Sequence, residues 1–142
     1  MIRPRVLLAD DHPDLLEATT ALLTPAFDIV GTAGDGAALV SEALRLCPDV
    51  IVADITMPIL TGIEAAHRLH EVALSAKFVF LTIHSEEQFV EACVAEGGLG
   101  YVIKSHMRVH LIPAIRAALV GESYISPLFP GDVRGPRMPD CY

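Results

Sequence analysis

The stretch Val50-Ile51-Val52-Ala53-Asp54 holds four consecutive apolar residues followed by a carboxylate. An unbroken apolar run of this length favours a strand that is covered on both faces, as in a parallel sheet. Similar short strand patterns at residues 6–9, 29–33, 78–81 and 101–103 alternate with segments of helical periodicity. This alternation indicates right-handed βαβ units. The sequence therefore predicts an α/β fold, a five-stranded parallel doubly wound sheet with five helices and the flavodoxin-like strand order 2-1-3-4-5.

The last predicted helix and the residues after it set the expected domain boundary. Pro113 falls inside the apolar pattern of this helix. Because proline removes a backbone donor, the helix is expected to begin late, near Ile112, or to be kinked. Residues 122–142 are rich in proline and glycine and have no periodic apolar segment. We expect one domain at residues 3–121, followed by a linker or tail.

Composition limits the class of protein. The chain has 142 residues, a net charge of −8 and 52% hydrophobic residues, which suits one folded domain and excludes a disordered chain. It has no run of 18 apolar residues and no secretory signal pattern at residues 1–5, so we expect neither a membrane span nor export. The three cysteines form no CxxC pair. These features predict a cytoplasmic protein, and its acidity argues against general nucleic-acid binding.

Polar side chains follow several of the predicted strands. They are Asp10 and Asp11 after the first, Asp54 after the third, Thr82 after the fourth and Lys104 after the fifth. The carboxyl ends of parallel strands meet at one edge of the sheet, so these side chains should converge. Three neighbouring carboxylates repel one another unless a cation joins them, and oxygen ligands of this kind suit Mg²⁺. The sequence thus predicts a magnesium site at this edge.

The remaining polar residues fit chemistry on a phosphoryl group. An ammonium group such as that of Lys104 neutralises charge on a phosphoryl oxygen, and the Thr82 hydroxyl can donate to a second oxygen. Asp54 is then the nucleophile, which forms an acyl phosphate. The loop after Asp54, which contains Pro58 and Gly62, is expected to turn the Thr56 carbonyl toward the metal.

Several segments, in this order, resemble the receiver domain of two-component response regulators, most closely the NarL/FixJ type. They are Leu7-Leu8-Ala9-Asp10-Asp11-His12-Pro13, Pro48-Asp49-Val50-Ile51-Val52-Ala53-Asp54-Ile55-Thr56-Met57-Pro58, Gly62-Ile63-Glu64, Leu81-Thr82-Ile83-His84, Gly100-Tyr101-Val102-Ile103-Lys104-Ser105 and Gly121-Glu122-Ser123-Tyr124-Ile125-Ser126-Pro127. Each segment alone is a weak signal. Together, with several of them at the ends of predicted strands, they are specific.

The resemblance implies a phosphorylation switch. Asp54 would receive a phosphoryl group from a phosphohistidine of a sensor histidine kinase, with Mg²⁺ required. Asp11, Asp54 and the Thr56 carbonyl would bind the metal directly, and Asp10 would assist through water. Thr82 and Tyr101 would form the switch pair that reshapes the face made by the fourth helix, the fifth strand and the fifth helix. Such a domain assists its own phosphorylation and dephosphorylation without being an enzyme in the usual sense.

The resemblance also bears on the output of the chain. Regulators of the NarL/FixJ type normally carry a helix-turn-helix, and nothing after Pro127 resembles one. We therefore expect no DNA binding by this chain alone and a phosphorylation-dependent homodimer. The output is expected to be transcription, controlled through a DNA-binding domain that these residues lack.

Two other readings of the same residues remain open at the level of sequence. One is a phosphohydrolase of the haloacid dehalogenase type, although Asp54-Ile55-Thr56 lacks the second acid of its DxD motif. The other is a degenerate receiver that serves only as a docking module, although every phosphorylation residue is present. Turnover on a phosphate ester would distinguish the hydrolase from a receiver, which takes up phosphate without turnover.

Overall fold

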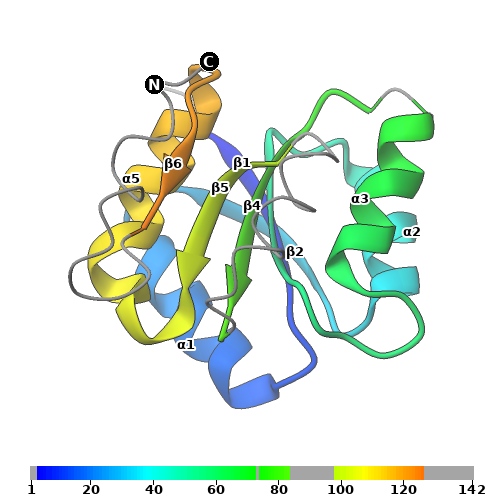
Figure 1. Cartoon of the computed structure of the whole chain (residues 1–142), viewed down its shortest axis with the longest axis horizontal. Coiled ribbons are helices and arrows are strands. Elements are labelled where there is room, and N and C mark those ends of the chain that lie inside the picture. The colour runs from blue at the N-terminus through cyan, green and yellow to red at the C-terminus, as the bar shows by residue number, and fades with distance from the viewer. Residues whose placement is uncertain (1–2, 73, 84–97, 127–142) are drawn as a thin grey trace.

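The computed structural model describes residues 3–72, 74–83 and 98–126. Within them, six parallel strands form one sheet in the order β2-β1-β3-β4-β5-β6 (Figure 1). This confirms the predicted order of the first five strands and adds a sixth. The strands are β1 (Arg5–Ala9), β2 (Asp28–Ala33), β3 (Val50–Asp54), β4 (Lys77–Thr82), β5 (Gly98–Ile103) and β6 (Tyr124–Ile125).

Helices cover both faces of the sheet, with α1 and α5 on one side and α2 and α3 on the other (Figure 1). They are α1 (Pro13–Leu23), α2 (Gly36–Leu46), α3 (Gly62–Glu71) and α5 (Met107–Leu119), and a short 3₁₀ helix, η1 (Lys104–His106), precedes α5. The helix expected within residues 85–96 lies outside the described residues. None of the helices in the described ranges is long and apolar enough to cross a membrane.

Strand β3 explains why its sequence is apolar without alternation. All five of its residues are buried. Val50 and Val52 pack in the core beneath α1 and α5, whereas Ile51 and Ala53 pack in the core beneath α2 and α3. Because both faces of the strand meet a hydrophobic layer, a polar residue is tolerated only at its end, where Asp54 stands.

The loop between β3 and α3 is held by hydrogen bonds at the start of α3. Thr61 and Glu64 form a capping box, in which the Glu64 N–H donates to Thr61 Oγ1 at 3.1 Å and the Thr61 N–H donates to Glu64 Oε1 at 2.8 Å. The Gly62 N–H donates to the Ile55 carbonyl at 2.7 Å. These bonds satisfy helix donors that would otherwise lack partners and fix the backbone that follows Asp54.

Helix α5 corrects one expectation from the sequence. The helix begins at Met107 and continues through Pro113 to Leu119, so the expected late start near Ile112 is wrong. Pro113 has no N–H to donate to the Val109 carbonyl four residues earlier. Burial of Met107 and Leu111, which precede Pro113 in the helix, stabilises this first part of α5 against the sheet.

Strand β6 was not predicted, because a pairing of two residues leaves no periodic signal in a sequence. Tyr124 and Ile125 pair in parallel with Gly100 and Tyr101 of β5. Ser126, which follows β6, is fully buried. Its N–H donates to the Tyr101 carbonyl at 3.0 Å, and its hydroxyl oxygen accepts from the Ile103 N–H at 3.1 Å. The described chain is thus attached to β5 as far as residue 126.

We predict that Gly62→Ala destabilises the fold by about 3 kcal/mol, because backbone cannot yield easily to an inserted methyl group. A Cβ at Gly62 would lie 2.2 Å from the Asp54 carbonyl oxygen. Gly34 offers a matched control, since a Cβ there meets nothing within 4 Å. Urea unfolding should show a change within about 1 kcal/mol for Gly34→Ala. Equal stability of the two variants would contradict the close approach at Gly62.

Candidate functional site

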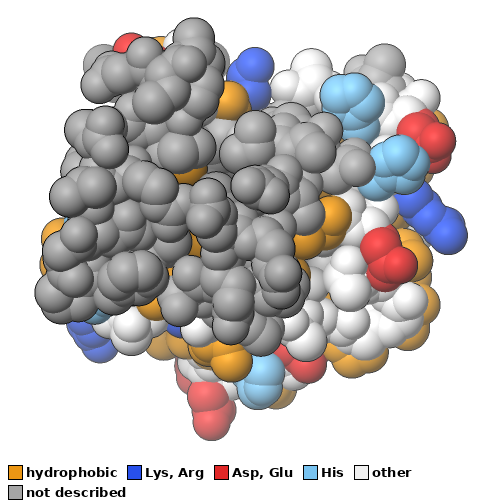
Figure 2. Space-filling model, viewed as in Figure 1, with side chains coloured by type: hydrophobic (Ala, Val, Ile, Leu, Met, Phe, Trp, Pro, Cys, Tyr) orange, Lys and Arg blue, Asp and Glu red, His pale blue; other side chains and the backbone are white. Residues whose placement is uncertain are grey.

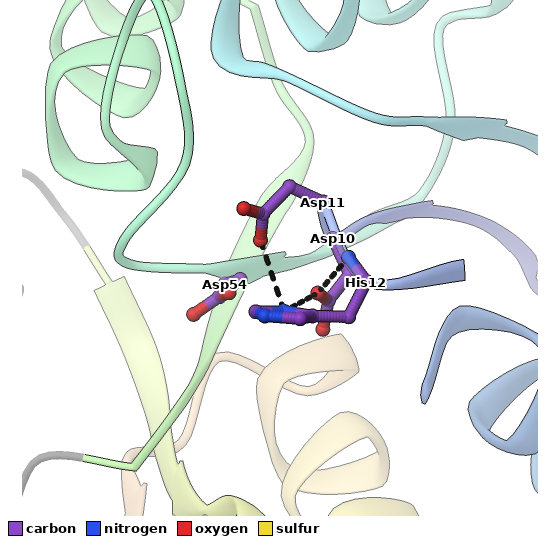
Figure 3. Close-up of side chains that lie close together, drawn as sticks. All are labelled: Asp10, Asp11, His12 and Asp54. Carbon is purple, nitrogen blue, oxygen red and sulfur yellow. Dashed lines mark hydrogen bonds and ion pairs between the residues drawn. The ribbon is translucent and has the colours of Figure 1, made fainter. Parts of the chain in front are cut away.

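Two buried carboxylates lie side by side at the carboxyl edge of the sheet. Ala9 and Ala53 are partners in the pairing of β1 with β3, so Asp10 and Asp54, which follow them, lie on adjacent strands. Each of these aspartates is only 4% exposed. Figure 3 shows Asp10, Asp11 and Asp54 gathered around one space at this edge. The structure therefore brings together the three carboxylates that the sequence predicted to converge.

Lys104 contacts both Asp10 and Asp54, although it follows β5, which is separated from β3 by β4. It is the first residue of η1, directly after β5. Its Nζ donates to Asp54 Oδ2 at 3.0 Å and lies 3.1 Å from Asp10 Oδ2. The Lys104 side chain is 9% exposed, so the ion pairs lie where solvent screens them little. One buried ammonium thus faces two buried carboxylates.

The pKa of Asp54 is set mainly by the burial of its side chain. Burial raises the pKa of Asp54, and the nearby charge of Asp10 adds to this rise. The hydrogen bond and charge of Lys104, together with the Thr56 N–H that donates to Asp54 Oδ1 at 3.3 Å, lower the same pKa and only partly offset the effect of burial. Asp54 is held in an environment where extra positive charge would be favourable.

His12 is a member of the site that the sequence did not identify as one. It occupies the N-cap position of α1, but its side chain makes no capping hydrogen bond. Instead, its Nδ1 lies 3.2 Å from Asp10 Oδ1 and 3.1 Å from Asp11 Oδ1 (Figure 3). The only sequence signal was its position directly after the Asp10-Asp11 pair, because a capping role and a site role look alike in a sequence.

The donors at this edge fit a divalent cation. One ligand atom from each of Asp10, Asp11, His12 and Asp54 lies within 4.8 Å of every other. Asp10 Oδ2 and Asp11 Oδ1 are buried and accept no hydrogen bond. The nearby Lys104 and His12 nitrogens therefore act on them as charges or dipoles and not as hydrogen-bond donors. Buried carboxylate oxygens without hydrogen bonds are the ligands that a hard cation prefers.

The remaining predicted site residues lie around this cluster. Thr82 ends β4, is fully buried, and is the pairing partner of Ile103 in β5. Tyr101 lies in β5 and is 2% exposed, so its ring is already inside the protein. Thr56 is exposed and follows Asp54 by two residues. The structure places Thr82 and Lys104 at the ends of neighbouring strands, whereas Tyr101 lies two residues before the end of β5.

Comparison with known proteins identifies the family. Residues 6–116 match the response regulator receiver domain. The chain belongs to the receiver domain family of response regulators. Over 123 residues it is 34% identical to the nitrate/nitrite response regulator NarL of Escherichia coli K12, which covers 85% of this chain and 57% of that protein. This similarity makes it a receiver domain of the NarL/FixJ type, and the haloacid dehalogenase alternative is not supported.

Other relatives agree with this assignment. The chain is 38% identical over 121 residues to the uncharacterized transcriptional regulatory protein YxjL of Bacillus subtilis, covering 84% of this chain and 56% of YxjL. A LuxR-family response regulator from Aurantimonas sp. SI85-9A1 superposes with a TM-score of 0.83 at 31% identity, covering 88% of this chain and 91% of that chain. The receiver domain thus spans a little over half the length of the two regulators NarL and YxjL.

A further solved structure is similar in fold and contains magnesium, the ion that the sequence predicted for the acidic edge, which is the edge of the sheet with Asp10, Asp11 and Asp54. The CheX-CheY complex of Borrelia burgdorferi, which contains BeF₃ and Mg²⁺, aligns with a TM-score of 0.78 at 26% identity. The match covers 82% of this chain and 89% of that chain.

We predict that Asp54→Asn stabilises the receiver domain at neutral pH. Because burial raises the pKa of Asp54 in the folded state, ionisation of Asp54 destabilises that state. This cost begins at pH values above the pKa of Asp54 in the unfolded chain, and it is complete at pH values above its pKa in the folded chain. Asparagine avoids this cost, so the variant should be more stable than the wild type at pH 8, and the gain should shrink toward pH 4. Urea unfolding at both pH values measures it, with the exposed Asp28→Asn as control. A gain that does not depend on pH would contradict the prediction.

Proposed function

We propose that this receiver domain accepts a phosphoryl group on Asp54 from a sensor histidine kinase and changes its surface in response. The observation that carries the proposal is the contact of Lys104 Nζ with Asp54 Oδ2 at 3.0 Å beside Asp10 and Asp11. A nucleophilic carboxylate, a fixed cation and a second pair of acids are the groups that phosphoryl transfer to aspartate requires.

The transfer itself is a displacement at phosphorus. An Asp54 carboxylate oxygen bonds to the phosphorus while the bond between the phosphorus and the kinase histidine nitrogen breaks, and the electron pair of that bond returns to the imidazole. The Lys104 ammonium, which neutralises Asp54 in the unmodified domain, then lies beside the phosphoryl oxygens and offsets their charge. We expect the hydroxyl of Thr82, the last residue of β4, to donate to another of these oxygens.

The acidic cluster is proposed as the magnesium site. Asp11, Asp54 and the Thr56 carbonyl would hold Mg²⁺ directly, with Asp10 contributing through water. The support from this chain is the pair of buried oxygens, Asp10 Oδ2 and Asp11 Oδ1, that accept no hydrogen bond. A bound Mg²⁺ supplies positive charge that neutralises the carboxylates and the incoming phosphoryl oxygens.

The proposed readout runs through Thr82 and Tyr101 to the face that includes β5 and α5. In the described structure, two large apolar side chains are exposed on this part of the molecule, Val109 of α5 at 70% and Val120, the residue after α5, at 71%. Exposed apolar residues of this kind suit contact with another protein surface. We propose a phosphorylation-dependent homodimer through this face, which would in turn control transcription through a DNA-binding domain.

DNA binding is not proposed for the receiver residues themselves. The chain has a net charge of −8, which repels a duplex. On the face that Figure 2 shows, the described Lys and Arg side chains are dispersed among acidic and neutral ones and do not gather into a patch. A phosphoryl group would add roughly two more negative charges.

We predict that Asp54→Asn lowers the rate of phosphate incorporation at least about 100-fold, because an amide oxygen is a much poorer nucleophile than a carboxylate. The assay is incubation of the full chain with Mg²⁺ and acetyl phosphate, followed by intact-mass measurement of one added phosphate. Asp28→Asn, which changes an exposed aspartate at the start of β2, should retain the wild-type rate. Equal incorporation by both variants would rule out Asp54 as the acceptor.

We predict that beryllofluoride with Mg²⁺ shifts the chain from monomer toward dimer in analytical ultracentrifugation. Val109→Asp should prevent this shift, because it places a charge on the proposed apolar contact. Leu44→Asp changes a side chain of α2 that is 49% exposed, and the dimer should survive it. Dimerisation that resists Val109→Asp, or is lost equally in both variants, would move the interface away from α5.

A further inference from the structure

The position of His12 at the acidic edge has no role in the proposed phosphoryl transfer. Its side chain is 67% exposed, while the Asp10 side chain beside it is 5% exposed. The His12 N–H donates to Asp10 Oδ1 at 2.9 Å, which fixes the backbone so that the ring turns back over the carboxylates. Figure 3 shows the Nδ1 edge of the ring directed at Asp10 and Asp11, with Asp54 across the same space.

The spacing of these donor atoms is that of neighbouring ligands on one ion. Metals bound at about 2.1 Å in octahedral geometry hold adjacent donor atoms about 3.0 Å apart. His12 Nδ1 lies 3.2 Å from Asp10 Oδ1 and 3.1 Å from Asp11 Oδ1. One oxygen of Asp10 and one of Asp11 are buried and accept no hydrogen bond, so the cluster has oxygens that are not committed to hydrogen bonds as well as suitable spacing.

The outer edge of the ring is free to carry the ring proton. A neutral imidazole that binds a metal through Nδ1 must hold its proton on Nε2. Because His12 is 67% exposed, a proton on Nε2 can be hydrogen-bonded by water. The exposed ring can therefore change from lying against the two carboxylates to binding a metal beside them, because its Nε2 remains hydrogen-bonded by water.

We propose that His12 Nδ1 is a ligand that makes this site favour first-row transition ions such as Mn²⁺ and Co²⁺ more than a site of oxygen donors alone would. The inference rests on the proposed function only in that the same acidic edge binds a divalent cation. Imidazole suits transition metals, whereas Mg²⁺ prefers carboxylates and water. His12 thereby sets which divalent ion occupies the site and leaves Asp54 as the phosphoacceptor.

The test uses Mn²⁺ bound to the full chain and electron spin-echo spectroscopy, which detects the nitrogen of a coordinated imidazole. The wild type should show nitrogen modulation that disappears when excess Mg²⁺ displaces the Mn²⁺. The modulation should be lost in His12→Phe and in His12→Gln. His70→Phe, which removes an exposed histidine of α3, should retain it.

Calorimetric titration with metals gives a second readout. The dissociation constant for Co²⁺ should rise about 10-fold or more in His12→Phe, since losing or disturbing a ligand has effects of this size. The constant for Mg²⁺ should change less than about threefold, because oxygen donors dominate its binding. Equal changes for the two ions would overturn the proposal.

The outcomes separate this inference from the proposed function. Bound Mn²⁺ that Mg²⁺ displaces but that shows no nitrogen modulation, or modulation that persists in both His12 variants, would overturn the role of His12 alone. Failure of the wild type to bind either ion would overturn the magnesium site as well, and the role of His12 with it.

Discussion

The contact of one lysine with two buried carboxylates governs the chemistry of this domain. Asp10 and Asp54 are each 4% exposed and lie on adjacent strands, so their charges repel in a region of low polarizability. Lys104 Nζ lies within 3.1 Å of both and offsets part of this repulsion. Because one ammonium cannot balance two carboxylates and Asp11 as well, the edge retains an affinity for positive charge.

The sheet provides this arrangement because it allows polar residues at only one place along each strand. The interior of β3 is apolar toward both helical layers, so a carboxylate can stand only at its end. The pairing of β1 with β3 then brings Asp10 beside Asp54 without any contact between distant loops. Gly62 completes the geometry, because a Cβ at this position would lie only 2.2 Å from the Asp54 carbonyl oxygen, so α3 can start here only with a residue that has no side chain.

The sequence predicted the features that follow from repeating patterns, but it did not predict the orientation of individual side chains. Strand order and the convergence of Asp10, Asp54 and Lys104 follow from apolar runs and their polar ends, and the structure agrees. In α1 the apolar residue Ala18 is exposed, whereas the polar residue Thr19 beside it is buried. The Thr19 hydroxyl donates to the Leu15 carbonyl at 2.8 Å, so the polar group is satisfied locally. The site role of His12 was also missed, because the direction of its ring depends on the backbone turn before α1 and leaves no pattern in the sequence.

Residues 124–126 give β5 a second neighbour beside β4. Tyr101 pairs with Ile125, its carbonyl accepts from the Ser126 N–H, and the Ile103 N–H two residues later donates to the Ser126 hydroxyl. Lys104, which contacts Asp54, is the next residue after Ile103. A displacement of the end of β5 must therefore either carry residues 124–126 with it or break two hydrogen bonds, one of them between buried groups. Because leaving a buried donor or acceptor without a partner is costly, residues 124–126 are mechanically joined to the strand that carries Tyr101 and precedes Lys104.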